Sequence, residues 1–243
     1  MMTSTHLSIA TISWARNDVE EQLLKASLQQ LSHLNIPVFI TDGGSGDAFI
    51  DFVQSLPNVT LLMAKEKGLQ AQARNSLQAA YDSGPSFILY TEPDKEAFFQ
   101  TGLPLLLESF QPANQFGIQL AARSAAGFAS FPAFQQMTET TINNCCAEAT
   151  GKRLDYTYGP FLLKRELVPY LNLLKEDVGW GWRPYLFILA HRSGLTVEAY
   201  VFDFYCPPGQ REDDAKERIY RMRQLEQNIR GIILATQAQL EEE

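Results

Sequence analysis

The sequence predicts an α/β fold: a doubly wound, mostly parallel sheet flanked by helices, with a long C-terminal helix. Over the first hundred residues, short apolar runs alternate with stretches of helical periodicity. The turns between them are short, which favours parallel strands joined by right-handed crossovers. The apolar runs are nearly continuous, as expected for strands covered on both faces of a sheet.

The first half of the chain supplies four expected strands and three helices. The second helix shows one apolar face, formed by Phe49, Val53 and Leu56 among others. Glycines before it permit a tight turn, and Ser45 or Asp47 is expected to cap it. In chain order we expect strand 6–13, helix 19–34, strand 36–41, helix 49–56, strand 59–63, helix 69–81 and strand 87–90.

The second half is less regular. In chain order we expect strand 116–122, loop 128–134, helix 135–148, strand 156–163, short helix 165–174, buried helix 182–193, strand 196–204 and helix 213–240. The last helix carries a narrow apolar stripe of Met222, Leu225, Ile229 and Ile232. Packing across the sheet domain is its first expected role, dimerisation the second, and binding to a membrane surface the third.

Composition excludes several classes of protein. The 243-residue chain has a net charge of −8, which argues against nucleic acid as a partner. Its three cysteines, Cys145, Cys146 and Cys206, have no metal-binding spacing. No apolar run approaches the roughly 20 residues of a membrane span, and no signal peptide is visible. We therefore expect no transmembrane segment and a soluble, cytoplasmic protein.

Two carboxylates, Glu92 and Asp94, follow the fourth strand. On an extended segment they point the same way, because they lie two residues apart. Such a pair suits a hard divalent cation that also holds phosphate. The alternative is that they cap a helix beginning near Phe98.

Further polar groups follow other strands or precede a helix. They are Ser13–Asn17, Asp42–Ser45, Gln72–Asn75 and Lys175–Asp177. Strand ends in a parallel sheet converge on one crevice, so these groups could share a site. No GxGxxG motif follows the first strand, and no phosphate-binding GxxxxGK loop exists, so neither dinucleotide nor P-loop chemistry is supported.

The order of these motifs resembles a family 2 glycosyltransferase of the GT-A fold. The matching segments are Asp42-Gly43-Gly44-Ser45, Gly68 followed by Ala73-Arg74-Asn75, Glu92-Pro93-Asp94, and Glu176-Asp177, across roughly residues 6–205. The resemblance implies transfer of a sugar from a nucleotide-diphosphate sugar to a hydroxyl acceptor, with Mg²⁺ or Mn²⁺. Inversion is the default, although retaining enzymes share the fold.

For the donor, the resemblance implies that Asp42 contacts the base and Arg74 lies near the diphosphate. Ser13, Arg16 and Gly43 would complete the nucleotide-sugar site. We expect a single domain over 1–243, with a nucleotide-binding half at 1–100, an acceptor half at 101–208 and the C-terminal helix at 209–243.

The resemblance also implies the metal and acceptor groups. Asp94 would be the main metal ligand, helped by Glu92, which replaces the usual first aspartate. Asp177, or else Glu176, would be the general base. The acceptor would meet two aromatic rings, Trp180 and Trp182.

Other interpretations remain open. A sugar nucleotidyltransferase has a similar sheet, but its glycine- and arginine-rich first loop is absent after Ser13. A non-catalytic relative that binds a nucleotide sugar is the third hypothesis, suggested by the Glu92-Pro93 departure. Taken singly, each motif could also be a turn, a helix cap, an exposed charge or, for the tryptophans, core packing.

Overall fold

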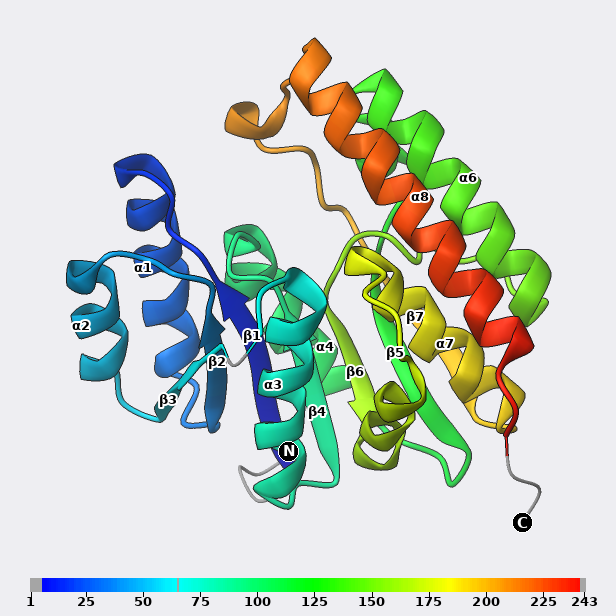
Figure 1. Cartoon of the computed structure of the whole chain (residues 1–243), viewed down its shortest axis with the longest axis horizontal. Coiled ribbons are helices and arrows are strands. Elements are labelled where there is room, and N and C mark those ends of the chain that lie inside the picture. The colour runs from blue at the N-terminus through cyan, green and yellow to red at the C-terminus, as the bar shows by residue number, and fades with distance from the viewer. Residues whose placement is uncertain (1–5, 65, 241–243) are drawn as a thin grey trace. The chain divides into compact units, whose positions relative to one another are not determined.

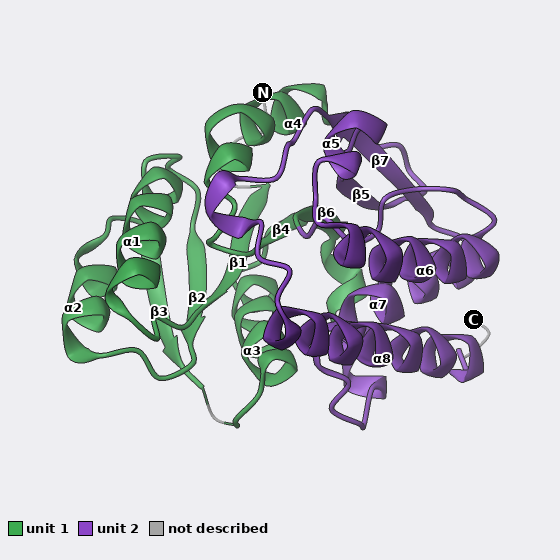
Figure 2. Ribbon diagram, turned by 90° about the horizontal axis from the view of Figure 1, so that it is seen from above, with its two compact units in different colours: residues 1–111, 160–168 green, residues 112–159, 169–243 purple. Residues whose placement is uncertain are grey.

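The computed structural model describes residues 6–64 and 66–240. The chain divides into two compact units (Figure 2). Unit 1 comprises residues 1–111 and 160–168, and unit 2 comprises residues 112–159 and 169–243.

Unit 1 contains five strands in the order β3-β2-β1-β4-β6. They are β1 (Leu7–Ser13), β2 (Val38–Asp42), β3 (Val59–Met63), β4 (Phe87–Thr91) and β6 (Phe161–Lys164). The first four pair in parallel, and β6 pairs antiparallel with β4. The strands expected in the first half of the chain are therefore confirmed, within two residues at each end.

The helices of unit 1 connect these parallel strands. They are α1 (Asp18–Ser32), α2 (Asp47–Ser55), α3 (Leu69–Asp82) and, after a π-helical turn at Phe98–Gly102, α4 (Leu103–Ser109). Helix α3 packs on β1 and β2, and α1 and α2 lie together on the other face of these strands (Figure 2). This arrangement is the doubly wound layer that the alternating periodicity predicts.

The cap expected for α2 is wrong. Its N-cap residue is Gly46, and no side chain bonds to the first turn. Ser45 instead accepts the backbone N–H of Ala15 at 2.8 Å and donates its hydroxyl to Asp42. The turn is therefore tied back to the end of β1 rather than to the following helix.

Unit 2 contains the parallel strands β5 (Phe116–Arg123) and β7 (Thr196–Phe202). Its helices are α5 (Ala125–Ala129), α6 (Ala133–Thr150), α7 (Trp182–Arg192) and α8 (Ala215–Gln237), with 3₁₀ turns at Gly179–Gly181 and Pro208–Gln210. Helix α5 extends over the first two residues of the segment 128–134, which the sequence predicts as irregular chain. A further 3₁₀ helix, Arg165–Leu173, follows β6.

Helix α8 confirms the long C-terminal helix, but its buried face differs from the predicted stripe. Met222 is 49% exposed, whereas Asn228, Gly231, Ile232 and Ala235 are buried. The helix packs on α6, α7 and the Gly179–Gly181 turn (Figure 1). Small residues let the backbones approach closely there, and Ile232 of the predicted stripe is buried beside them.

The strand expected at 156–163 is shorter, because its first residues bond elsewhere. The backbone N–H of Tyr156 donates to Asn143 Oδ1 at 2.8 Å, and Thr157 Oγ1 donates to Asp155 Oδ1 at 2.8 Å. The strand β6 begins only at Phe161. Within the described part of the chain, no helix is both long and apolar enough to cross a membrane.

Candidate functional site

The carboxyl ends of β1, β2 and β4 meet at one edge of the unit 1 sheet. Ser13 is aligned with Asp42, and Thr11 with Thr91, in parallel register. The residue after Thr91 is Glu92, so Ser13, Asp42 and Glu92 follow adjacent strands at the same edge. The convergence expected from the sequence is therefore present for these three residues.

Asp42 is buried and accepts four hydrogen bonds. Oδ2 accepts the hydroxyls of Ser13 and Ser45, both at 2.7 Å. Oδ1 accepts the backbone N–H groups of Gly44 at 2.8 Å and Ser45 at 2.6 Å. The carboxylate thus fixes the ends of two strands, a role closer to the turn interpretation than to direct contact with a base.

Helix α3 covers this turn from the side. A Cβ atom on Gly43 would lie 2.8 Å from Nε2 of Gln72, so glycine lets the amide rest on the backbone. Asn75 donates to Thr41 Oγ1 and to the carbonyl of Met63, each at 3.3 Å. Arg74 is half-buried on the same helix.

The two carboxylates after β4 have different environments. Glu92 is buried, at 7% exposure. Asp94 is half-exposed, and both of its oxygens accept Lys95 Nζ at 2.9 Å. The helix that follows begins at Glu96, and the backbone N–H of Phe99 donates to the carbonyl of Lys95 at 3.1 Å, so a capping role for Glu92 and Asp94 stays a prediction.

Trp14, for which no role is predicted from the sequence, is 53% exposed directly after β1. The Arg16 guanidinium lies 5.6 Å from its ring centre. Arg16 also donates to both oxygens of Glu20, at 3.0 and 2.7 Å, and this bond lowers the pKa of Glu20. The exposure of the Trp14 ring beside a buried polar turn marks it as a candidate ligand contact, and this exposure is visible only in the structure.

The acidic pair of unit 2 lies before the Gly179–Gly181 turn. Both carboxylate oxygens of Glu176 accept hydrogen bonds from the guanidinium of Arg230, the shortest of them 2.7 Å. Asp177 is exposed and accepts the backbone N–H of Gly179 at 2.9 Å. Neither carboxylate caps α7, whose N-cap residue is Gly181.

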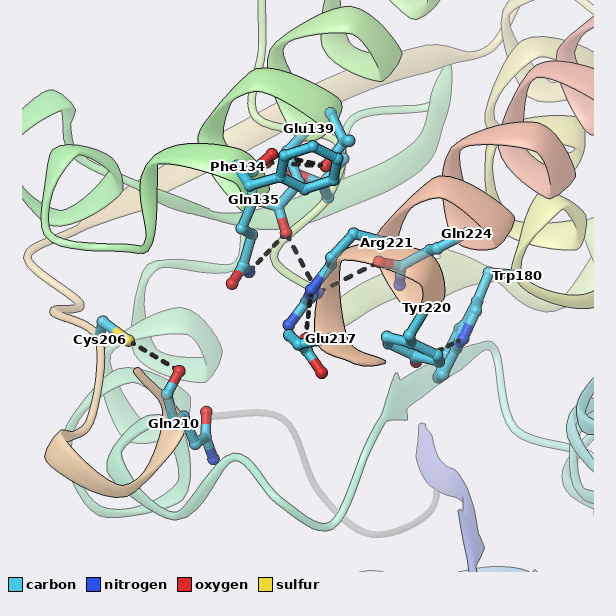
Figure 3. A network of polar contacts seen from close by, with 12 residues as sticks. Phe134, Gln135, Glu139, Trp180, Cys206, Gln210, Glu217, Tyr220, Arg221 and Gln224 are labelled. Carbon is cyan, nitrogen blue, oxygen red and sulfur yellow. Dashed lines mark hydrogen bonds and ion pairs between the residues drawn. The ribbon is translucent and has the colours of Figure 1, made fainter. Parts of the chain in front are cut away.

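The two tryptophans of this segment differ. Trp182 is 1% exposed in the first turn of α7, so the expectation that its ring meets an acceptor is wrong: a ring enclosed by the protein offers no face to a sugar. Trp180 is half-buried and donates Nε1–H to the Tyr220 hydroxyl at 3.0 Å (Figure 3). Arg183 lies 4.7 Å from the centre of the Trp180 ring.

A buried charged cluster, absent from the sequence-based expectations, stands at the end of β5. Arg123 donates to Glu139 and Asp155, each at 2.7 Å. Phe128 and Phe131 lie 4.7 and 4.6 Å from its guanidinium. Burial alone would raise the pKa of Asp155, but the charge of Arg123 and its hydrogen bonds offset this and hold that pKa below its ordinary value.

The cluster continues onto α8 through Arg221. Arg221 Nη1 lies 3.8 Å from Glu139 Oε1, and its Nε donates to Glu217 at 2.7 Å (Figure 3). All of these charges are neutralised by partners within unit 2. We therefore interpret the cluster as a structural link between β5, α6 and α8.

Among the described residues, no group of three or more histidine, cysteine, aspartate or glutamate side chains could enclose a metal ion. A cation at Glu92 and Asp94 would thus need ligands from a bound molecule or water. Mg²⁺ commonly binds in this way, through one or two carboxylates and substrate phosphates.

Comparison with solved structures shows which fold these elements form. The chain has the fold of a GT-A glycosyltransferase, as the order of its motifs predicts. Glucosyl-3-phosphoglycerate synthase from Mycobacterium tuberculosis, in complex with phosphoglyceric acid, matches with a TM-score of 0.68 and 14% identity over 95% of this chain and 80% of that one.

Two further structures of the same synthase are similar to this chain. The complex with Mn²⁺, uridine-diphosphate-glucose and phosphoglyceric acid has a TM-score of 0.68 and 13% identity, over 95% of this chain and 79% of that one. The complex with Mg²⁺ and uridine-diphosphate has a TM-score of 0.66 and 15% identity, with the same coverage. No family model and no curated protein matches the chain.

Proposed function

We propose that this protein is a glycosyltransferase that moves a sugar from a nucleotide-diphosphate sugar to a hydroxyl acceptor. The observation that carries the proposal is the alignment of Ser13, Asp42 and Glu92 at one edge of a parallel sheet. In open α/β sheets this edge is where ligands bind. The fold neighbours, whose structures contain uridine-diphosphate or its glucose ester, support uridine as the first base to test.

In this proposal the turn organised by Asp42 shapes the donor site. Ser13 and Gly43 form its floor, and Arg16 and Arg74 offer positive charge to the diphosphate. Trp14 offers an exposed aromatic face on which a base could stack. Asp42 would act mainly by holding the strand ends, since its oxygens are already bonded.

Glu92 and Asp94 fit a divalent cation, because hard carboxylate oxygens are the ligands that Mg²⁺ and Mn²⁺ prefer. Asp94 would be the main ligand and would exchange its bond with Lys95 for the cation. When bound, the cation would neutralise charge on the departing nucleoside diphosphate.

On the acceptor side, Asp177 would take the proton from the attacking hydroxyl, and Trp180 would line the acceptor site. Glu176 is the second candidate for the base. Attack by the hydroxyl opposite the leaving diphosphate would invert the anomeric carbon. The domain halves near residues 1–100 and 101–208 would then correspond to donor and acceptor binding.

The test is a transfer assay with purified protein. We expect release of nucleoside diphosphate from a nucleotide sugar in the presence of Mn²⁺ and a hydroxyl acceptor, with phosphoglycerate as the first acceptor to try. Uridine-diphosphate-glucose is the first donor, followed by guanosine- and adenosine-diphosphate sugars. Absence of turnover with every donor and acceptor would contradict the proposal.

Two alternatives give different results in the same experiment. A sugar nucleotidyltransferase would release pyrophosphate from a nucleoside triphosphate and a sugar phosphate. A non-catalytic relative would bind the donor without turnover. Dimerisation through α8 and a cytoplasmic location remain predictions, the first checked by light scattering and the second by cell fractionation.

A further inference from the structure

Helix α8 holds the segment 175–182, which carries the proposed base, through three side chains. Arg230 forms a two-pronged ion pair with Glu176, at 2.7 Å from Nη2 to Oε1 and 3.0 Å from Nε to Oε2. Gln227 Oε1 accepts the backbone N–H of Trp180 at 3.1 Å. The Tyr220 hydroxyl accepts the Trp180 indole N–H (Figure 3).

The backbones of the two segments also touch. A Cβ atom on Gly231 would overlap the carbonyl oxygen of Gly181, and one on Gly181 would overlap the carbonyl oxygen of Gln227. Gly179 has a φ of +50°, and a Cβ there would collide with the side chain of Gln227. Only glycine satisfies both the conformation and the close approach, so the position of the turn is determined by α8.

The contacts separate the two acidic residues. Both Glu176 oxygens accept guanidinium protons, whereas the exposed Asp177 accepts one backbone N–H through Oδ1. The Asp177 bond to Gly179 fixes the direction of its side chain relative to the turn that α8 holds. Both side chains are exposed, but Glu176 is held in the ion pair with Arg230 and is thus the anchor, which leaves Asp177 as the candidate base.

We propose that α8 is a positioning element for the catalytic base. Its residues Arg230, Gln227 and Tyr220 hold the 175–182 segment so that Asp177 can take the proton from the acceptor hydroxyl. This inference rests on the proposed function. The Arg230–Glu176 pair is about half-exposed, at 48% and 50%, and such pairs contribute little to stability. Its loss should therefore affect catalysis more than folding.

The experiment compares Arg230→Ala with Arg230→Lys, Tyr220→Phe and the control Arg223→Ala, an exposed arginine of the same helix. We expect Arg230→Ala to lower kcat about ten- to a hundredfold, the range typical of a misplaced catalytic group. Donor affinity and melting temperature should stay at the wild-type values. Arg230→Lys should restore part of kcat, Tyr220→Phe should lower it less, and Arg223→Ala should leave it unchanged.

Glu176→Gln distinguishes an anchor from a base. As an anchor, Glu176→Gln should reduce kcat no further when combined with Arg230→Ala, because both changes break one contact. If Glu176 were the base, Glu176→Gln alone would abolish transfer while Arg230→Ala kept most of it, and the proposal would be overturned. Wild-type kcat and acceptor KM in Arg230→Ala would overturn it as well.

Hydrogen exchange separates failure of this inference from failure of the proposed function. We expect the amides of Gly179, Trp180 and Gly181 to exchange faster in Arg230→Ala than in Arg223→Ala, whether or not the protein transfers sugar. Unchanged protection would refute the positioning role of α8. Faster exchange in Arg230→Ala, together with no turnover in the wild type, would refute the proposed function. It would leave intact the conclusion that α8 holds the 175–182 segment in place.

Discussion

Asp42 lies where the sequence predicts it, but its hydrogen bonds come from Ser13 and from the turn that it belongs to. The sequence predicts Asp42 at the end of the second strand, where it is the last residue of β2 and is aligned with Ser13. Its four hydrogen bonds, however, were invisible in the sequence, because they depend on how the turn folds back to Ala15. The residue therefore organises the turn at the end of β2.

Asp94 gives the most direct test of the proposed cation site. Asp94→Ala should abolish metal-dependent nucleotide binding, because Glu92 alone cannot replace the missing oxygens. Calorimetric titration of the nucleoside diphosphate with and without Mn²⁺ measures the effect. Asp51→Ala, which removes an exposed carboxylate on α2, is the control. An unchanged affinity in Asp94→Ala would remove Asp94 from the site.

Asp177 tests the proposed base. Asp177→Asn keeps the side-chain oxygen that accepts the N–H of Gly179 but cannot take a proton. We expect donor binding to be unchanged and transfer to fall at least about a hundredfold, the lower range for general-base catalysis. Steady-state kinetics at saturating donor measures this. Full activity would move the base to Glu176 or to another residue.

The ionisation of Asp155 makes the stability of the protein depend on pH. Its pKa is held below the ordinary value of an aspartate, which is about 3.9 in the unfolded chain. The native state therefore gains stability from ionised Asp155 above that value and loses it as pH falls through the lower native pKa. Asp155→Asn should weaken the dependence of the unfolding free energy on pH below about pH 4, measured by urea titration. An unaltered slope would contradict this assignment.

At the scale of elements, hydrophobic periodicity predicts most of unit 1 because its strands are continuous apolar runs between short turns. It fails where polar or small residues decide the structure. The segment 153–159 is bound by Arg123 and Asn143, so β6 starts later than its apolar residues suggest. The buried face of α8 includes Ile232 of the apolar stripe but leaves Met222 exposed, because the close contact at Gly231 also determines the face.

The glycine contact leads to a prediction about α8 itself. Gly231→Ala should destabilise the protein by about 1–3 kcal/mol, the usual effect of overpacking a well-packed contact. Gly209→Ala is the matched control, since a Cβ there meets nothing within 4 Å. Thermal unfolding of both variants gives the comparison. Equal melting temperatures would mean that α8 can shift away from Gly181 without cost.

At the scale of the whole molecule, the fold could be predicted although the solved structures that share it have few residues in common with this chain. The solved structures cited above share its fold at 13–15% identity. The sequence does not show which side chains are exposed or which residues pair with each other. Examples are the burial of Trp182, the exposure of Trp14 and the ion pair between Glu176 and Arg230. These properties depend on residues distant in the chain.

The net charge of −8 has a consequence for an anionic donor. A nucleoside diphosphate would be repelled by the average field of such a protein, so binding requires local positive charge. Arg16 and Lys95 are paired with Glu20 and Asp94, so a divalent cation at Glu92 and Asp94 would be the main source of positive charge in the proposed site. The account therefore predicts that binding is cation-dependent.

The most direct measurement is a thermal-shift panel of UDP, GDP, ADP, CMP and NAD, each with and without Mn²⁺. At a hundredfold excess over the dissociation constant, a ligand stabilises the folded protein by about 2.7 kcal/mol. We predict a raised melting temperature for one nucleoside diphosphate, UDP first, only when Mn²⁺ is present. The absence of a shift for every nucleotide would contradict the account.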